Sequence, residues 1–272
     1  MVRYPVVLVP GYGSSILMAR YRESGATLQV FPRLLDADTA VQHFLMGRSD
    51  DHGDFHSYCE AHGIDIVPNT GNHGLEGITD LVPQLKTMSI TSFKLVFGPL
   101  KDRLEADGYV AGETLFGYPY DWRNLFFGPA IQGGLSDLVD RVHRQTGLPV
   151  VLIGHSMGGQ VIRAFMQKPD QCAKVKACFS VASPHGCLPV LGVESVLFGY
   201  NLKQSENMLT CASMRQVQNQ CGNTYAFLPR AEIPHMHPVP KVYMFVETVS
   251  GATGVRGDDI DVPAQTETER EG

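Results

Sequence analysis

The sequence predicts an α/β fold with a mostly parallel sheet and helices on both faces. Residues 5–9 and 149–153 are continuous apolar runs, typical of strands that are buried on both sides. Segments with helical spacing of apolar residues alternate with such runs along the chain. With 43% hydrophobic residues, the 272-residue chain can bury one core of this kind, so residues 1–272 are expected to form a single domain.

The first half of the chain contains two expected strands separated by a long irregular segment. The run at residues 5–9 ends in a turn-rich loop that begins at Pro10. Residues 31–79 have mixed polarity and weak periodicity, which indicates an insertion. Residues 95–109 have the apolar spacing of an amphipathic helix, and a short strand is expected at 114–118.

The second half of the chain continues the alternation of strand and helix. Apolar residues between 135 and 142 predict a helix that ends at a glycine. The strand at 149–153 runs directly into a glycine-rich turn, and apolar positions within 161–166 mark one face of the next helix. Further strands are expected at 176–182 and 241–246.

Composition and charge exclude several classes of function. The formal net charge is −6, whereas a nucleic-acid-binding surface is strongly basic, so we expect no nucleic-acid partner. No apolar run approaches the length of a membrane-spanning helix, and no signal-peptide pattern is present. The six cysteines have irregular spacing that fits no zinc pattern, and we expect no metal and no cofactor. The compartment and the oligomeric state remain open.

Residues 154–158 carry the pattern Gly-His-Ser-Met-Gly between an apolar strand and an amphipathic helix. This strand–turn–helix context is what a nucleophile turn requires, and Ser156 is therefore the candidate nucleophile. The amide of Met157, at the positive end of the helix, is the candidate first oxyanion donor. The amide of Tyr12, in the loop after the first strand, is the candidate second donor. A glycine-rich turn without catalytic function is the alternative.

Three motifs together resemble the lecithin:cholesterol acyltransferase family, which includes lysosomal phospholipase A2 and phospholipid:diacylglycerol acyltransferase. They are Val-Leu-Val-Pro-Gly at 7–11, Gly-Tyr-Pro-Tyr-Asp-Trp-Arg at 117–123 and Leu-Ile-Gly-His-Ser-Met-Gly-Gly at 152–159. The Tyr-Asp-Trp-Arg block discriminates best, because generic hydrolases lack it. The resemblance implies an α/β-hydrolase core with a lid or membrane-engaging insertion at 31–79 and a reduced cap region at 187–238.

The resemblance also implies a reaction in lipid metabolism. A fatty acyl group would pass from a phospholipid through a Ser156 acyl-enzyme to a lipid alcohol, such as a sterol or a diacylglycerol, or to water. The implied partners are the phospholipid, the lipid alcohol and, transiently, a membrane or lipid surface. The alternatives are a different serine lipase or esterase and an inactive family member. Family members work in the secretory pathway, the lysosome or the endoplasmic reticulum.

The Tyr-Asp-Trp-Arg block is expected to be structural. Asp121 and Arg123 would form a buried pair or caps near the floor of the site. In the animal family members a disulfide closes the lid, but Cys59 is the only cysteine within 31–79. The tryptophan of their lid is absent as well, because Trp122 is the only tryptophan in this chain. We therefore expect the insertion to be held in another way.

A serine nucleophile needs a base and a carboxylate that orients the base. Residues 257–263 resemble the acid loop of the family, with Asp259 as the favoured acid and Asp258 as the alternative. In this fold the base is a histidine that follows the acid in the chain, but no histidine follows this loop.

Other histidines could act as the base only against this chain order. They are His235 or His237 and, less favourably, His185; His155 lies within the turn itself and is expected to point away from Ser156. Two interpretations follow from the missing histidine. The chain is a shortened form that lacks the C-terminal part of the family fold, or it is a degenerate, inactive member.

Overall fold

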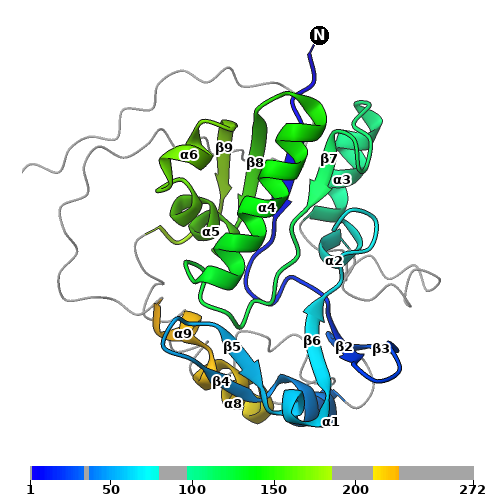
Figure 1. Ribbon diagram of the computed structural model, residues 1–272, viewed down its shortest axis with the longest axis vertical. Helices are drawn as coiled ribbons and strands as arrows, with labels where there is room; N and C mark the ends of the chain where they lie inside the picture. Colours follow the sequence, from blue (N-terminus) through cyan, green and yellow to red (C-terminus); the bar gives the residue numbers. More distant parts are fainter. Residues whose placement is uncertain (1, 34–36, 80–96, 186–210, 227–272) are drawn as a thin grey trace, which may run out of the picture.

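The computed structural model of the chain describes residues 2–33, 37–79, 97–185 and 211–226. At its centre is a four-stranded parallel sheet with the strand order β7-β1-β8-β9 (Figure 1). Its strands are β1 (Val6–Val9), β7 (Leu115–Gly117), β8 (Val150–His155) and β9 (Val175–Val181). Each of them coincides with a strand predicted from the sequence. The predicted α/β fold with a mostly parallel sheet is confirmed, and it is consistent with an α/β-hydrolase core.

Helices cover both faces of this sheet, which explains why its first strand is apolar throughout. They are α2 (Glu76–Thr79), α3 (Phe97–Ala106), α4 (Pro129–Thr146), α5 (Met157–Phe165) and the short α6 (Pro169–Cys172). Val7 and Val9 of β1 belong to one core cluster with α4 and α5. Val6 and Leu8, on the opposite face, belong to a second cluster with α2 and α3.

The longest helix, α4, has both of its ends encoded in the sequence. Pro129 occupies its first turn, where a missing N–H costs no hydrogen bond. Gly147 follows its last turn with φ 67°, and the Gly147 N–H donates to the carbonyl of His143. The apolar stripe between these ends, which includes Leu135 and Val139, is buried against the sheet.

A smaller layer is inserted between β1 and β7 and lies at the carboxyl ends of the sheet strands (Figure 1). It contains an antiparallel sheet of order β3-β2-β6 and a two-stranded pair, β4-β5. Its elements are β2 (Leu17–Tyr21), β3 (Thr27–Phe31), α1 (Ala37–Ala40), η1 (Val41–Leu45), β4 (Gly47–Ser49), β5 (Phe55–Ser57), η2 (Tyr58–His62) and β6 (Ile64–Pro68). Strands β2 and β3 precede the expected insertion at 31–79 and were not predicted.

Two helices near the end of the described chain pack against this smaller layer. They are α8 (Cys211–Gln220) and α9 (Gly222–Ala226). The side-chain carbonyl of Gln220 accepts a hydrogen bond of 3.0 Å from the Gly47 N–H. These helices belong to the expected cap region at 187–238, of which the described residues cover only 211–226. The strand expected at 241–246 lies outside the described residues.

A histidine placed between two carboxylates stabilises the β4-β5 pair. His56 Nε2 lies 3.3 Å from Asp50 Oδ2, and His56 Nδ1 lies 3.5 Å from Glu60 Oε2. The hydrogen bond to Asp50 and the neighbouring Glu60 carboxylate raise the pKa of His56 above its ordinary value. A pKa raised by folding contributes stability below the unfolded-state pKa, and this contribution disappears as the pH rises through the folded-state pKa.

We therefore expect the wild-type chain to lose stability as the pH rises above about 6.5. The His56→Gln variant should lack this component, and His52→Gln, in the same hairpin, should keep it. Urea unfolding midpoints between pH 5.5 and 8.5 measure the difference, which is small because the His56 side chain is 52% exposed. Identical pH profiles for wild type and His56→Gln would assign the dependence to another group.

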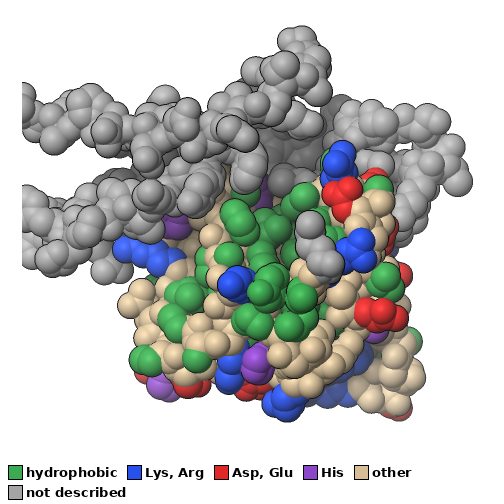
Figure 2. Space-filling view, turned by 90° about the horizontal axis from the view of Figure 1, so that it is seen from above, with side chains coloured by type: hydrophobic (Ala, Val, Ile, Leu, Met, Phe, Trp, Pro, Cys, Tyr) green, Lys and Arg blue, Asp and Glu red, His purple; other side chains and the backbone are tan. Residues whose placement is uncertain are grey.

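In the described part of the chain, no helix has the length and apolarity needed to cross a bilayer. Figure 2 views the molecule from above, at the end opposite to the smaller layer. Apolar side chains gather in the middle of this view, among charged side chains of both signs.

Candidate active site

The candidate nucleophile Ser156 lies in the sharp turn between β8 and α5. Its backbone has φ 52° and ψ −124°, a combination that residues other than glycine rarely adopt. The Ser156 N–H donates a 2.9 Å hydrogen bond to the carbonyl of Val181 at the end of β9. The Ser156 carbonyl accepts a 3.0 Å hydrogen bond from the Gly159 N–H. The strand–turn–helix arrangement predicted around Ser156 is therefore present.

Glycines allow this turn to pack tightly against its neighbours. A Cβ atom added to Gly158 would lie 2.7 Å from the Pro10 carbonyl oxygen and would overlap the Val9 carbonyl oxygen. A Cβ atom added to Gly154 would lie 2.7 Å from backbone atoms of Gly158. The first turn of α5 thus lies directly against the loop after β1, with no room for a methyl group between them.

The Gly158→Ala substitution is expected to lower the free energy of unfolding by about 1–3 kcal/mol, because the methyl group forces α5 away from β1. Gly133→Ala is the matched control, since an added Cβ there meets no atom within 4 Å and the residue lies in α4. That control should stabilise the chain by about 0.5–1 kcal/mol through helix propensity. Urea unfolding measures the stability of both variants. A change of the same sign in Gly158→Ala and Gly133→Ala would contradict the close approach of α5 to the loop after β1.

Two backbone amides near the turn are the candidate oxyanion donors. Met157 is the first residue of α5, so its N–H has no partner within the helix. Neither the Met157 N–H nor the Tyr12 N–H donates a hydrogen bond to any residue that the structure describes. A Cβ atom added to Gly11 would lie 3.0 Å from Ser156 Cβ, so the loop that carries Tyr12 passes beside the nucleophile. The roles of both amides remain predictions.

The Tyr-Asp-Trp-Arg block follows β7 and joins the main sheet to the smaller layer. Arg123 is 1% exposed, and its guanidinium binds the Asp121 carboxylate through Nε at 2.9 Å and Nη2 at 2.5 Å. Arg123 Nη1 donates to the Leu45 carbonyl at 3.1 Å and to Ser57 Oγ at 2.8 Å. The guanidinium carbon lies 4.5 Å from the centre of the Phe55 ring. The expected buried pair is confirmed, and it also fastens the insertion to the core.

The charge on Arg123 is maintained despite its burial. Burial alone disfavours the charged guanidinium, but the Asp121 carboxylate more than compensates, and the pKa of Arg123 is raised above its ordinary value. Arg123 therefore stays charged at physiological pH.

The two described histidines considered as bases are engaged elsewhere. The ring of His155 packs edge-on against Phe97, with 6.5 Å between ring centroids, and burial lowers the pKa of His155. His185 Nε2 lies 2.8 Å from Ser180 Oγ on β9, and burial also lowers the pKa of His185. Within the described ranges, Ser156 Oγ has no hydrogen-bond partner, so the structure does not bring either ring to the nucleophile as a base.

The remaining predicted site residues lie outside the part of the chain that the structure describes. These are the candidate acids Asp259 and Asp258 and the candidate bases His235 and His237. Their roles stay predictions. Among the described residues, no group of three His, Cys, Asp or Glu side chains is placed to hold a metal ion.

Asn223, a buried residue of α9, was not predicted from the sequence to have a role at this site. Asn223 Nδ2 donates to the carbonyl of Trp122 at 2.9 Å and also to that of Asn124, and its Oδ1 accepts from the Phe126 N–H at 2.7 Å. One side chain thus ties α9 to the segment that follows β7. No sequence signal marked it, because a single asparagine in a short helix carries no periodic pattern.

The sequence matches a known family over residues 60–250, described as lecithin:cholesterol acyltransferase. A phospholipase A(1) of Arabidopsis thaliana is 27% identical over 234 residues, which are 83% of this chain and 52% of the relative. A lysosomal phospholipase A and acyltransferase of Canis lupus familiaris is 27% identical over 212 residues, or 68% and 48%. A phosphatidylcholine-sterol acyltransferase of Oryctolagus cuniculus is 36% identical over 94 residues, or 32% and 21%. The chain spans about half the length of the first two relatives.

Proposed function

The chain belongs to the lecithin:cholesterol acyltransferase family, and from this premise we propose that it is a lipid O-acyltransferase or phospholipase. It takes a fatty acyl group from a phospholipid and passes it to a lipid alcohol, a sterol or a diacylglycerol, or to water. The strained turn that presents Ser156 between β8 and α5 carries the proposal. The names of the relatives, phospholipase A(1) and phosphatidylcholine-sterol acyltransferase, support the substrate class.

The proposed reaction has two steps at one serine. Ser156 Oγ attacks the acyl carbonyl of the phospholipid and gives its proton to a general base, while the amides of Met157 and Tyr12 stabilise the oxyanion. The lysophospholipid leaves with that proton, and the acyl group stays on Ser156 as an ester. The acceptor hydroxyl then attacks this ester, its proton passes through the base to Ser156 Oγ, and the new acyl ester or fatty acid is released.

The acid is taken from the resemblance, whereas the base is left open, because no histidine follows the acid loop. Asp259 orients the base, with Asp258 as the alternative acid. Among the histidines of this chain, His235 or His237 is favoured over His185, whose ring already binds a serine of β9. We expect a variant of the base to slow both acylation and deacylation, because the base moves a proton in each step.

We place the lipid-contacting surface on the insertion at residues 31–79. From α1 to β6 this part of the chain belongs to the smaller layer at the carboxyl ends of the sheet strands, where the Ser156 turn also lies (Figure 1). Tyr58 within it is 57% exposed, and Leu28 on the adjacent β3 is 37% exposed. Such side chains suit transient contact with a phospholipid surface.

Labelling with a fluorophosphonate probe followed by lipid analysis tests the proposal. The wild-type chain should be labelled at Ser156, and Ser156→Ala should not be labelled. Incubation with phosphatidylcholine vesicles should yield lysophospholipid, and adding a sterol or a diacylglycerol should divert acyl groups from free fatty acid to a new ester. Free fatty acid as the sole acyl product with every acceptor would contradict transfer. Absence of labelling in the wild type would contradict catalysis altogether.

A non-catalytic lipid-binding member is the second candidate. The engagement of the His155 and His185 rings elsewhere favours it. Binding to phosphatidylcholine vesicles without labelling of Ser156 and without lipid turnover would select this candidate, whereas labelling of Ser156 would reject it.

A further inference from the structure

Tyr120 contacts the loop after β1 at both of its ends. Its hydroxyl donates a 2.6 Å hydrogen bond to the Pro10 carbonyl, and its backbone N–H donates a 3.2 Å hydrogen bond to Ser15 Oγ. Tyr120 is 3% exposed and Ser15 is fully buried, so both bonds are shielded from water. Together they bracket residues 11–14, the segment that passes beside Ser156.

Between these two hydrogen bonds the loop forms a tight turn. The Ser14 N–H donates to the Gly11 carbonyl at 3.2 Å, and Gly13 adopts φ 64°. The Tyr12 ring packs against the Trp122 ring, with 4.8 Å between their centroids. The segment that follows β7 therefore contacts this loop in its middle as well as at its ends.

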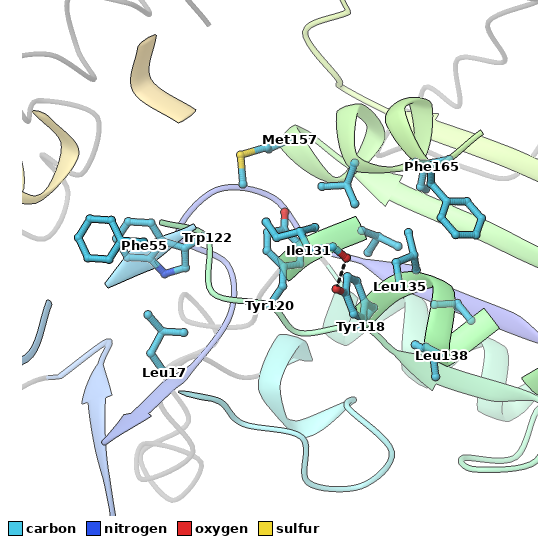
Figure 3. Packing of buried hydrophobic residues seen from close by; sticks show 14 of the residues in the cluster. Leu17, Phe55, Tyr118, Tyr120, Trp122, Ile131, Leu135, Leu138, Met157 and Phe165 are labelled. Carbon is cyan, nitrogen blue, oxygen red and sulfur yellow. Dashed lines mark hydrogen bonds between the residues drawn. The ribbon is translucent and has the colours of Figure 1, made fainter. Parts of the chain in front are cut away.

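Sheet topology explains why these segments meet. β1 and β7 are parallel neighbours with Leu8 paired to Gly117, so the segments that leave them emerge at the same edge of the sheet. The Tyr118 N–H extends this pairing by donating to the Leu8 carbonyl at 2.9 Å. Figure 3 shows Tyr120 between Trp122 and Tyr118, below Met157 at the start of α5.

The Pro10 carbonyl is the atom that links Tyr120 to the nucleophile turn. It accepts the Tyr120 hydroxyl, and it also lies 2.7 Å from where a Cβ atom on Gly158 would be. Pro10 is thus fixed between the hydroxyl of Tyr120 and the first turn of α5. We expect the loop to move relative to Ser156 when this carbonyl is released.

From these contacts we propose that Tyr120 is a positioning residue, which holds the Tyr12 amide in place as an oxyanion donor. The inference rests on the proposed acyl-transfer function, because it concerns the same site. Oxyanion stabilisation depends on donors that are fixed before negative charge develops. A displacement of about 1 Å in such a site costs about a hundredfold in rate. Tyr120 touches no reacting atom and acts through the loop.

The chain offers a closely matched control for Tyr120→Phe. The Tyr118 hydroxyl donates a 2.5 Å hydrogen bond to the Ile131 carbonyl in α4, and Tyr118 is 8% exposed. The rings of the two tyrosines lie 5.7 Å apart. Tyr118→Phe and Tyr120→Phe each remove one buried hydrogen bond to a backbone carbonyl and keep the ring. They differ in whether that carbonyl belongs to the loop beside Ser156.

The first readout is the second-order rate constant for phosphonylation of Ser156 by a fluorophosphonate. We expect Tyr120→Phe to lower it by about tenfold to a hundredfold, whereas Tyr118→Phe leaves it close to the wild-type value. Ser15→Ala, which removes the acceptor at the other end of the loop, should lower it as well. Equal rate constants for Tyr118→Phe and Tyr120→Phe would overturn the proposal, because loss of packing or stability affects both alike.

The second readout does not depend on activity. Hydrogen exchange of the amides at 11–14 should be faster in Tyr120→Phe than in the wild type, and unchanged in Tyr118→Phe. If the wild type shows no phosphonylation, the proposed function fails, but the exchange comparison still tests the contact. Unchanged exchange at 11–14 in both Tyr120→Phe and Ser15→Ala would overturn the positioning role whatever the labelling result.

Discussion

Replacing Arg123 by methionine is expected to lower the free energy of unfolding by about 3–5 kcal/mol. The substitution leaves the Asp121 carboxylate, which is 8% exposed, without its cation. It also removes the hydrogen bonds to the Leu45 carbonyl and to Ser57 Oγ, which are one of the links between the smaller layer and the core. The shift of the urea unfolding midpoint at constant slope measures this loss.

A surface ion pair provides the control for this experiment. Arg103 and Asp107 form a 3.0 Å pair whose side chains are 76% and 51% exposed, so Arg103→Met should change stability by less than about 1 kcal/mol. Replacing both buried partners, Asp121→Leu with Arg123→Met, should recover much of the loss because no lone charge remains buried. A single Arg123→Met variant no less stable than Arg103→Met would show that the buried pair does not hold the layers together.

The main sheet and its helices were predictable because their signals are local. A strand buried on both faces is a continuous apolar run, and the burial of Val6 and Val7 on opposite faces shows why β1 needs no alternation. The end of α4 was marked by Gly147, whose φ of 67° favours glycine. The turn at Ser156 was marked by the strand before it and the helix after it.

The smaller layer was not predicted, and only one of its three strand pairings, β2 with β6, is non-local. Leu17 of β2 pairs with Phe31 on one side and with Pro68 on the other. Strand β6 is only five residues long and is half-buried at every position, so its short Ile-Asp-Ile alternation is a weak signal. The pairing of β2 with β6 joins residues that lie 43 to 51 positions apart, and no short sequence window contains that information.

In the candidate site, too, local features were predicted from the sequence, whereas contacts between distant residues were not. The Asp121–Arg123 pair was expected, but its partners at Leu45 and Ser57 are 78 and 66 residues away from Arg123. The Tyr-Asp-Trp-Arg block was recognised as structural, yet the contact between the Tyr120 hydroxyl and the Pro10 carbonyl needed the folded chain. Every residue has a backbone carbonyl whatever its side chain, so a sequence motif does not show which carbonyl accepts a hydrogen bond.

Replacing Ser156 by glycine is expected to abolish phosphonylation and to stabilise the fold. The rate should fall by several orders of magnitude, because the attacking oxygen is gone. At φ 52° and ψ −124° a serine Cβ is strained, and glycine removes that strain. After the larger unfolded-state entropy of glycine is subtracted, a gain of about 1 kcal/mol in the free energy of unfolding should remain.

The same substitution in a relaxed helix should have the opposite effect on stability. Ser136 lies in α4, and its hydroxyl donates to the Gln132 carbonyl at 2.8 Å. Ser136→Gly should cost about 0.5–1 kcal/mol and leave phosphonylation unchanged. Continued labelling of Ser156→Gly would show that another residue is the nucleophile. A loss of stability equal to that of Ser136→Gly would show that the Ser156 backbone is not strained. If Ser156 is retained for its reactivity at a cost in stability, the Ser156→Gly variant should be more stable than the wild type and unreactive.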